Sequence, residues 1–280
     1  MYKYKLGMST SRSFGLDIET ELKLFRAAGF ECFHTGWRED LKKCRKVADE
    51  IGIEFEAVHA TFGKMGFMWQ EGDEVEEFIE AFIGCVRSCA EVNVPILVAH
   101  VYGGKVEDIE PSEIGLKRLR RAVDEAKRLG VKIAFENTYK PEHLAAVMEE
   151  FKDYDNVGFC IDTGHQCCMT PDVDMMELYG DRLIYTHLND NLGISDYNGK
   201  FNIQDDLHLL PMDGIADWEK IARQMNKFDY KGTLTLELSV ENCDNRYDNE
   251  KYQRVDIRQY IAEAYARACR FAALRERNKI

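Results

Sequence analysis

Short apolar runs alternate with longer amphipathic segments along the whole chain. Eight apolar, β-branched runs predict strands at residues 4–8, 30–34, 54–59, 96–101, 132–136, 157–162, 183–188 and 233–238. Apolar residues at helical spacing predict helices at 18–28, 41–51, 74–92, 112–129, from Pro141 onward, 217–228 and 255–274. Eight strand–helix units predict a (β/α)8 TIM barrel, with residues 1–280 forming a single domain. A doubly wound sheet is the competing architecture, although no early Gly-x-Gly-x-x-Gly supports dinucleotide binding.

The connections between these elements are uneven in length. Single glycines, Gly29, Gly52 and Gly130, separate three predicted helices from the strands that follow them. The segments that follow strands are longer, at residues 61–73, 102–111 and 189–215. Because the loops that leave strands build the active face of an α/β barrel, this asymmetry predicts a site at the carboxyl ends of the strands.

Side chains that can bind a metal or titrate end six successive predicted strands. They are His59, His100, Glu136, Asp162, His187 and Glu237. Burying several carboxylates together is costly without a cation, because like charges repel and desolvation raises their pKa values. The last four residues therefore predict a divalent metal site. Three carboxylates and one imidazole suit Mn²⁺, Co²⁺, Mg²⁺ or Fe²⁺, and additional histidines shift the preference toward Zn²⁺.

Composition narrows the range of partners. The chain has 280 residues and a net charge of -13, which argues against sequence-independent binding to nucleic-acid phosphates. It contains no apolar run of about 18 residues, so no membrane span is expected, and it begins without a signal-peptide apolar region. The nine cysteines are odd in number and scattered, as expected for reduced thiols in a cytoplasmic protein.

Several motifs, taken in their order and spacing, resemble the xylose-isomerase-like barrel superfamily. They are Glu136-Asn137, Asp162-Thr-Gly-His165, His187-Leu-Asn-Asp190, Asp206-Leu-His208 with Pro211, Gly214 and Trp218 after it, and Glu237. The similarity runs over nearly the whole chain. This superfamily includes sugar and sugar-phosphate isomerases and epimerases as well as endonuclease IV, and its members are often dimers or tetramers, so the resemblance implies a homo-oligomer.

The ketose 3-epimerase branch implies one metal ion bound by Glu136, Asp162, His187 and Glu237. It also implies that Glu136 and Glu237 are the acid/base pair and that His165 contacts the substrate. One glutamate would remove a proton and the other would return it to the opposite face, through a metal-stabilised enediolate. The expected function is a metal-dependent isomerase or epimerase that acts on a small-molecule ketose or ketose phosphate.

The endonuclease IV branch implies three zinc ions that share nine ligands. The matching residues are His59, His100, Glu136, Asp162, His165, His187, Asp206, His208 and Glu237. A zinc-dependent AP endonuclease that cleaves phosphodiesters is therefore the alternative, although the extra histidines can also bind sugar hydroxyls. The acidic segments 70–77 and 106–110 argue against nucleic acid as a partner. A non-catalytic metal- or sugar-binding barrel is a third interpretation, and it is disfavoured because all four core ligands are present.

Other residues support narrower expectations. The loop at residues 61–70 is a candidate lid, in which Phe67 and Trp69 would face the substrate. Ordinary packing of these aromatic rings against the barrel is the alternative interpretation. The same two interpretations apply to Trp37, just after the second predicted strand. His34 ends the second predicted strand and can reach the same mouth. Lys105 and Lys140 lie on active-face loops and are candidates to contact a phosphate. His143 is expected to be solvated, and the run Arg118–Arg121 is expected to be an exposed helix face.

Overall fold

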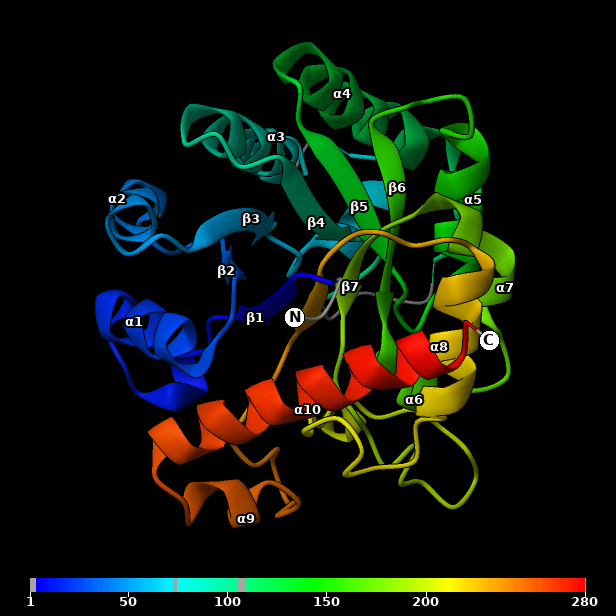
Figure 1. Cartoon of the computed structure of the whole chain (residues 1–280). Helices are drawn as coiled ribbons and strands as arrows, with labels where there is room; N and C mark the ends of the chain where they lie inside the picture. The colour runs from blue at the N-terminus through cyan, green and yellow to red at the C-terminus, as the bar shows by residue number, and fades with distance from the viewer. Residues whose placement is uncertain (1–3, 73–74, 105–108, 280) are drawn as a thin grey trace.

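The computed structural model describes residues 4–72, 75–104 and 109–279, in which eight parallel strands form a barrel surrounded by helices (Figure 1). The strands are β1 (Leu6–Ser9), β2 (Cys32–Gly36), β3 (Glu54–His59), β4 (Ile96–His100), β5 (Lys132–Glu136), β6 (Val157–Asp162), β7 (Leu183–His187) and β8 (Leu234–Leu236). Their order in the sheet is β7-β6-β5-β4-β3-β2-β1-β8. Between β7 and β8, Leu188 donates its N–H to Thr235 O at 2.8 Å and accepts from Glu237 N at 3.2 Å. The predicted TIM barrel is confirmed.

The α-helices are α1 (Ile18–Ala28), α2 (Leu41–Ile51), α3 (Glu76–Glu91), α4 (Glu113–Leu129), α5 (Pro141–Glu150), α6 (Thr163–Cys168), α7 (Met175–Tyr179), α8 (Trp218–Lys227), α9 (Glu250–Gln253) and α10 (Ile257–Arg277). The described residues also form four short 3-10 helices: η1 (Arg12–Phe14), η2 (Met65–Trp69), η3 (Gly180–Arg182) and η4 (Ile203–Asp205). Within the described residues, no helix has both the length and the apolar character needed to cross a bilayer.

Helix caps explain the short connections on one side of the barrel. Gly29 and Gly130 adopt φ values of 118° and 72° and end α1 and α4 in the left-handed conformation. Because glycine tolerates positive φ, the chain can leave a helix and enter the next strand almost at once. The longer connections lie at the opposite ends of the strands, where the polar side chains gather.

The barrel interior is filled beneath those polar ends. Ala57, Val98, Ala134, Cys160 and Tyr185 form a compact buried cluster inside the barrel. The larger apolar core lies between the sheet and the helices. Cys160 precedes Asp162 by two residues on β6, so it faces the same way but lies deeper, as predicted. The interior is therefore a packed support for one functional face.

Two sequence predictions about the segments after β5 and β6 need correction. The short helices α6 and α7 lie between β6 and β7, where no helix is predicted, because five or six residues are too few to show helical periodicity. His143 is expected to be solvated but is fully buried, with its ring 4.8 Å from that of Trp69 and 4.6 Å from that of Tyr102. Tertiary packing of α5 against the loops therefore overrides the exposure expected from its sequence position.

Arg118 is also buried, although the run that contains it is expected to be exposed. Its guanidinium donates hydrogen bonds to Met68 O at 2.9 Å, Gln70 O at 2.5 Å and Gly72 O at 2.6 Å. Carbonyl oxygens that are buried within a loop need hydrogen-bond donors, and the planar guanidinium of Arg118 supplies several donors at once. Arg118 therefore fixes the loop between β3 and α3 to helix α4.

Phe67 and Trp69 in the same loop are packed as the alternative interpretation expects, and a lid stays a prediction. Trp69 is 2 % exposed, and its indole N–H donates to Val101 O at 2.9 Å. A Cβ on Gly115 would lie 2.2 Å from the Trp69 ring, so this ring packs directly against α4. Phe67 packs against the core and, like Trp69, does not line the cavity described below. The part of the loop that borders the cavity is Thr61–Gly63.

Candidate metal centre

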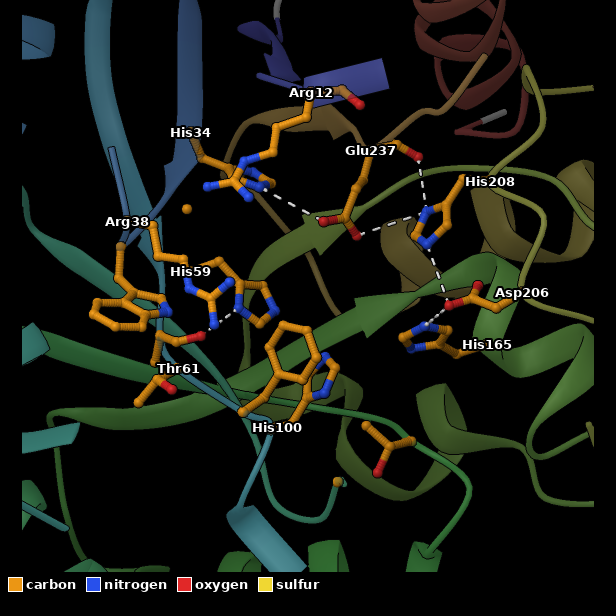
Figure 2. Close-up of a pocket in the computed structure, with 18 of the residues that line it drawn as sticks. Arg12, His34, Arg38, His59, Thr61, His100, His165, Asp206, His208 and Glu237 are labelled. Carbon is orange, nitrogen blue, oxygen red and sulfur yellow. Dashed lines mark hydrogen bonds and ion pairs between the residues drawn. The ribbon is translucent and has the colours of Figure 1, made fainter. Parts of the chain in front are cut away.

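The carboxyl ends of the strands open into one cavity of about 730 Å³ (Figure 2). Its lining includes the carboxylates of Asp206 and Glu237 and five histidines, namely His34, His59, His100, His165 and His208. Glu136, Asp162 and His187 lie beneath this lining and are at most 1 % exposed. The size of the cavity suits a small molecule more than a polymer. Its floor combines imidazoles with carboxylates that are almost completely shielded from water.

Four of the predicted ligands meet at the floor of this cavity. Glu136, Asp162 and His187 end β5, β6 and β7, and Glu237 follows β8 directly. Each offers one ligand atom, and these four atoms all lie within 4.8 Å of one another. His187 Nδ1 lies 3.3 Å from Glu136 Oε1 and 2.9 Å from Glu237 Oε2. The sequence prediction that these side chains converge is therefore matched by the geometry.

Glu136 and His187 have buried polar atoms at this floor that lack hydrogen-bond partners among the described residues. Neither carboxylate oxygen of Glu136 and neither ring nitrogen of His187 makes a hydrogen bond within the described part of the chain. Buried charged and polar groups are normally hydrogen-bonded, and orphaned ones are costly. A divalent cation among these atoms would satisfy all of them. The donor set of three carboxylates and one imidazole thus fits the metal that the resemblance implies.

Two further groups of ligands adjoin the first. Nε2 of His59 and Nε2 of His100 lie 3.4 Å and 3.3 Å from Glu136 Oε2. Nε2 of His165 and Nε2 of His208 each lie 3.3 Å from Oδ2 of Asp206. Each group of three holds its ligand atoms within 4.8 Å of one another. All nine residues matched to the three-ion arrangement therefore lie in adjacent, metal-sized groups.

The orientation of three histidines fits metal binding. Nδ1 of His59 lies 2.9 Å from Ala60 O, and Nδ1 of His165 lies 2.9 Å from Asn137 O. Nδ1 of His208 lies 3.3 Å from the carbonyl oxygen of Glu237. An imidazole that donates Nδ1–H to a carbonyl presents Nε2 to a metal, which binds once that nitrogen has lost its proton. The backbone thus sets the tautomer that each of these rings needs.

Asn137 and Asn189 position Asp162, a role that the sequence alone does not indicate. Asn137 exchanges two hydrogen bonds with the backbone of Asp162, at 2.9 Å and 2.8 Å. Asn189 Nδ2 donates to Asp162 Oδ2 at 2.8 Å, and Asp162 Oδ1 accepts from His165 N at 2.7 Å. A Cβ on Gly164 would lie 1.9 Å from Asn189 Oδ1. The glycine in this motif therefore leaves room for the amide that orients the carboxylate.

Asp190 organises the long loop that carries Asp206 and His208. Its carboxylate accepts hydrogen bonds from Asn191 N at 2.8 Å, Met212 N at 2.8 Å, Ala216 N at 3.0 Å and Trp218 Nε1 at 2.8 Å. These bonds tie the two ends of the loop to the end of β7. His208 itself has φ 49°, a left-handed conformation that is uncommon outside glycine. The loop thus holds this imidazole in a specified place.

At the floor of the cavity, burial disfavours the charged forms of the carboxylates and imidazoles, and their mutual attraction favours those forms. Burial disfavours ionisation of Glu136, but nearby imidazoles, led by His187, hold its pKa well below the usual range. Burial raises the pKa of Asp162 to about 6. Burial disfavours the imidazolium of His208, but Asp206 outweighs it and raises that pKa to about 10. Imidazolium charge therefore balances the carboxylates, and a bound divalent ion would displace those protons.

Other lining residues were not all found from the sequence. His34 reaches the cavity as expected, with Nε2 3.7 Å from Glu237 Oε1, and Trp37 also lines it. Phe62 covers His59 and His100, with ring centroids 5.4 Å and 4.8 Å away. Of the two candidate lysines, Lys140 does not line the cavity and Lys105 lies outside the described residues. Parts of the acidic segments 70–77 and 106–110 also lie outside the described residues. Arg12 and Arg38 line the cavity, and no motif pointed to them.

A profile of the family described as Xylose isomerase-like TIM barrel matches residues 22–265. The uncharacterised protein y4fM of Sinorhizobium fredii is 26% identical over 301 residues, covering 90% of this chain and 92% of that protein. A probable endonuclease 4 of Nitrosopumilus maritimus is 27% identical over 200 residues, covering 65% of this chain and 70% of that protein.

Solved structures share the fold. D-psicose 3-epimerase of Clostridium cellulolyticum H10, with D-tagatose, superimposes with a TM-score of 0.72 at 14% identity, over 94% of this chain and 96% of that chain. The IOLI protein with a bound zinc atom superimposes with a TM-score of 0.70 at 17% identity, over 95% and 96% of the two chains. At these identities, the likeness establishes a common architecture.

Proposed function

Because the chain belongs to the xylose isomerase-like TIM barrel family, we propose that it is a divalent-metal-dependent isomerase or epimerase of a ketose or ketose phosphate. The observation that carries this proposal is the pair of carboxylates, Glu136 and Glu237, which lie 3.3 Å and 2.9 Å from His187 Nδ1 at the floor of a small-molecule cavity. The superimposed D-psicose 3-epimerase supports it. A cytoplasmic location and a homo-oligomeric state stay predictions.

The metal would be bound by Glu136, Asp162, His187 and Glu237. When bound there, a divalent ion would polarise a substrate carbonyl and favour negative charge on its oxygen. Mn²⁺ or Zn²⁺ is the ion we expect first, with Co²⁺ or Mg²⁺ as alternatives. Asn189 and His165 N would hold the carboxylate of Asp162 in a fixed orientation while the substrate enters.

Proton transfer would be the work of the two glutamates. One glutamate must be ionised to remove the proton next to the carbonyl, and the other must hold a proton to deliver it to the opposite face. The pair therefore shares one proton at the start of each turnover. The first glutamate then gives its newly acquired proton to solvent, and the second regains one from it. The apolar part of the cavity wall, including Phe62 and Trp37, would contact C–H groups of the substrate and exclude water.

Exchange of substrate hydrogen with solvent tests this proposal. A panel of ketoses and ketose phosphates in D₂O, with Mn²⁺ or Co²⁺ added, is expected to include a member that gains deuterium beside its carbonyl and forms an isomer. Glu136→Gln and Glu237→Gln should each abolish both signals and keep the wild-type circular dichroism spectrum. Glu142→Gln, outside the cavity, is the matched control. Wild-type exchange in either cavity variant would refute the proton-transfer roles.

A second candidate, hydrolysis of a phosphate ester, is favoured by one specific observation. Nine ligands occur in three adjacent groups, although an isomerase of the proposed type needs only one group. The partial similarity to a probable endonuclease 4 agrees with this candidate. Several cations side by side can stabilise both the attacking and the leaving oxygen of a phosphate ester. The net charge of -13 argues against DNA as its substrate.

Two measurements separate the candidates. The zinc-loaded protein can be incubated with a duplex that contains an abasic site, and the strands can be analysed for a nick. Retention on DNA-cellulose at low salt provides an independent test, because phosphate contacts make such binding strongly salt-dependent. We expect neither cleavage nor salt-sensitive retention. Either result at stoichiometric protein would favour the nuclease and count against the isomerase.

A further inference from the structure

The cavity is divided by charge into two sides. The nine metal-type ligands come from the ends of β3 to β8 and from the segments that follow them. The segments after β1 and β2 contribute Arg12 and Arg38 instead. Figure 2 shows both guanidinium groups near His34 and His59, across the cavity from His165, Asp206 and His208 in this view. Of the described residues that line the cavity, only Arg12 and Arg38 carry a permanent positive charge.

These arginines keep hydrogen-bond donors available to a ligand. No ion pair or hydrogen bond among the described residues involves the guanidinium of Arg38, which lies over the Trp37 ring at 5.4 Å from its centroid. Stacking on an aromatic face leaves the edge donors of a guanidinium unused. Arg12 Nε lies 3.9 Å from Glu39 Oε1, at the long limit of an ion pair, and its side chain is 72% exposed. Neither cation is therefore neutralised by a close carboxylate.

The neighbouring acids do not cancel this charge. Glu21 lines the same side of the cavity, is 4% exposed and accepts a hydrogen bond from Ser11 N at 2.7 Å. Burial raises the pKa of Glu21 to about 8, so its carboxyl is protonated at neutral pH. Glu39 is the other acid beside these two guanidiniums, and its Oε1 approaches Arg12 Nε no closer than 3.9 Å. In a protein with a net charge of -13, this local excess of positive charge is distinctive.

We infer that Arg12 and Arg38 form a subsite for an oxyanion, a phosphate or a carboxylate, on the side of the cavity across from His165, Asp206 and His208. Guanidinium groups bind such oxyanions through paired N–H donors. This inference deepens the proposed function, because it specifies that the ketose is anionic. Lys140 does not line the cavity and Lys105 lies outside the described residues, so the subsite is built on these two arginines alone.

Binding of matched ligands to the metal-loaded protein tests the subsite. The ligands are D-fructose, D-fructose 6-phosphate and D-fructuronate, which differ at the carbon remote from the carbonyl. Titration calorimetry should show that an anionic member binds at least about tenfold more tightly than D-fructose, as expected for charge-assisted hydrogen bonds. The preferred anion distinguishes a phosphate from a carboxylate. Equal affinities, or no binding by any member, overturn the inference.

Variants identify the residues responsible. Arg38→Ala and Arg12→Ala should each weaken binding of the preferred anion by about tenfold and change D-fructose binding by less than about twofold. Glu39→Gln removes the opposing charge and should strengthen anion binding. Arg26→Ala, on the exposed face of α1 outside the cavity, is the matched control. If an anion binds tightly and its affinity is the same in both arginine variants as in wild type, it contacts the metal side of the cavity, and that result overturns the subsite.

The binding measurement is independent of turnover. Tight, arginine-dependent binding without solvent exchange would reject the proposed isomerase and keep the oxyanion subsite. Exchange on a neutral ketose, with no preference for an anion, would keep the isomerase and reject the subsite. The two proposals therefore fail on different observations.

Discussion

His187 Nδ1 lies 2.9 Å from Oε2 of Glu237, across the seam between β7 and β8. This seam is where the barrel closes, and the backbone of Leu188 completes the pairing there. A cation that binds both side chains would therefore also join the two strands at the ends of the sheet. The site and the closure of the fold depend on the same residues.

Metal removal should for that reason lower stability. We expect chelation to reduce the melting temperature, because a ligand that binds only the folded state stabilises it, by about 2.7 kcal/mol at one hundred times its Kd. Asp162→Ala and His187→Ala should lower the metal content found by elemental analysis. Asp172→Ala, an exposed carboxylate outside the site, should leave it unchanged. Unchanged stoichiometry in both site variants would contradict the assigned ligands.

Asp206→Asn tests whether the group with His165 and His208 binds an ion of its own. Asp206 Oδ2 lies 3.3 Å from Nε2 of both histidines, and Oδ1 has no hydrogen-bond partner among the described residues. The variant keeps the shape and removes the charge. If this group binds an ion of its own, the saturated variant should lose one metal equivalent while the ion at the four-ligand group stays bound. If the metal content stays the same and only KM rises, the group binds substrate hydroxyls instead.

The order of elements could be predicted from the sequence because a parallel barrel leaves a strong pattern. Helices 18–28 and 41–51 match α1 and α2 residue for residue, since Gly29 and Gly52 mark their ends. The core ligands were predictable for a similar reason. Glu136 and Asp162 end successive apolar strands, and equivalent positions of parallel strands meet at one face of the barrel.

The remaining features depend on contacts that no local pattern encodes. Arg12 and Arg38 lie in short segments after β1 and β2, and residue spacing there does not indicate which way a side chain points. Trp69 is a large aromatic residue in a long loop, as a lid residue would be, but its ring packs against α4 where Gly115 leaves space for it. His143 is polar, yet the aromatic rings around it bury it. Tertiary packing decided each of these positions.

Glu21 gives a pH dependence to stability. Its pKa in the folded protein is about 8, because burial raises it from 4.5. A raised pKa means that the folded state binds this proton more tightly than the unfolded state does. The stabilisation is fully present below pH 4.5 and is lost as the pH rises through 8, by an amount on the order of a few kcal/mol.

Glu21→Gln should remove this dependence, since the amide oxygen can still accept from Ser11 N and carries no charge to bury. Melting temperatures between pH 5 and pH 9, compared with wild type, should show the variant to be the more stable protein at the alkaline end. Glu19→Gln, on the exposed part of α1, is the control and should follow wild type. A parallel pH profile in Glu21→Gln would show that the wild-type carboxyl is already ionised.

Arg118 should be important to stability, unlike other arginines on the same helix. Its guanidinium hydrogen-bonds three loop carbonyls from a buried position, whereas Arg121 makes ion pairs with Glu76 and Glu80 at the surface. Arg118→Ala leaves those carbonyls without their charged donor, which costs about 2 kcal/mol or more. Exposed ion pairs contribute little, so Arg121→Ala should cost less than about 1 kcal/mol.

Thermal unfolding of both variants checks this difference. For a domain of this size, the Arg118→Ala loss corresponds to a fall in melting temperature on the order of 5 °C. Limited proteolysis should then cut first in the segment after β3, because that segment loses its anchor to α4. Arg121→Ala should keep the wild-type cleavage pattern. Equal melting temperatures for the two variants would show that the loop is held by the packing of Trp69 alone.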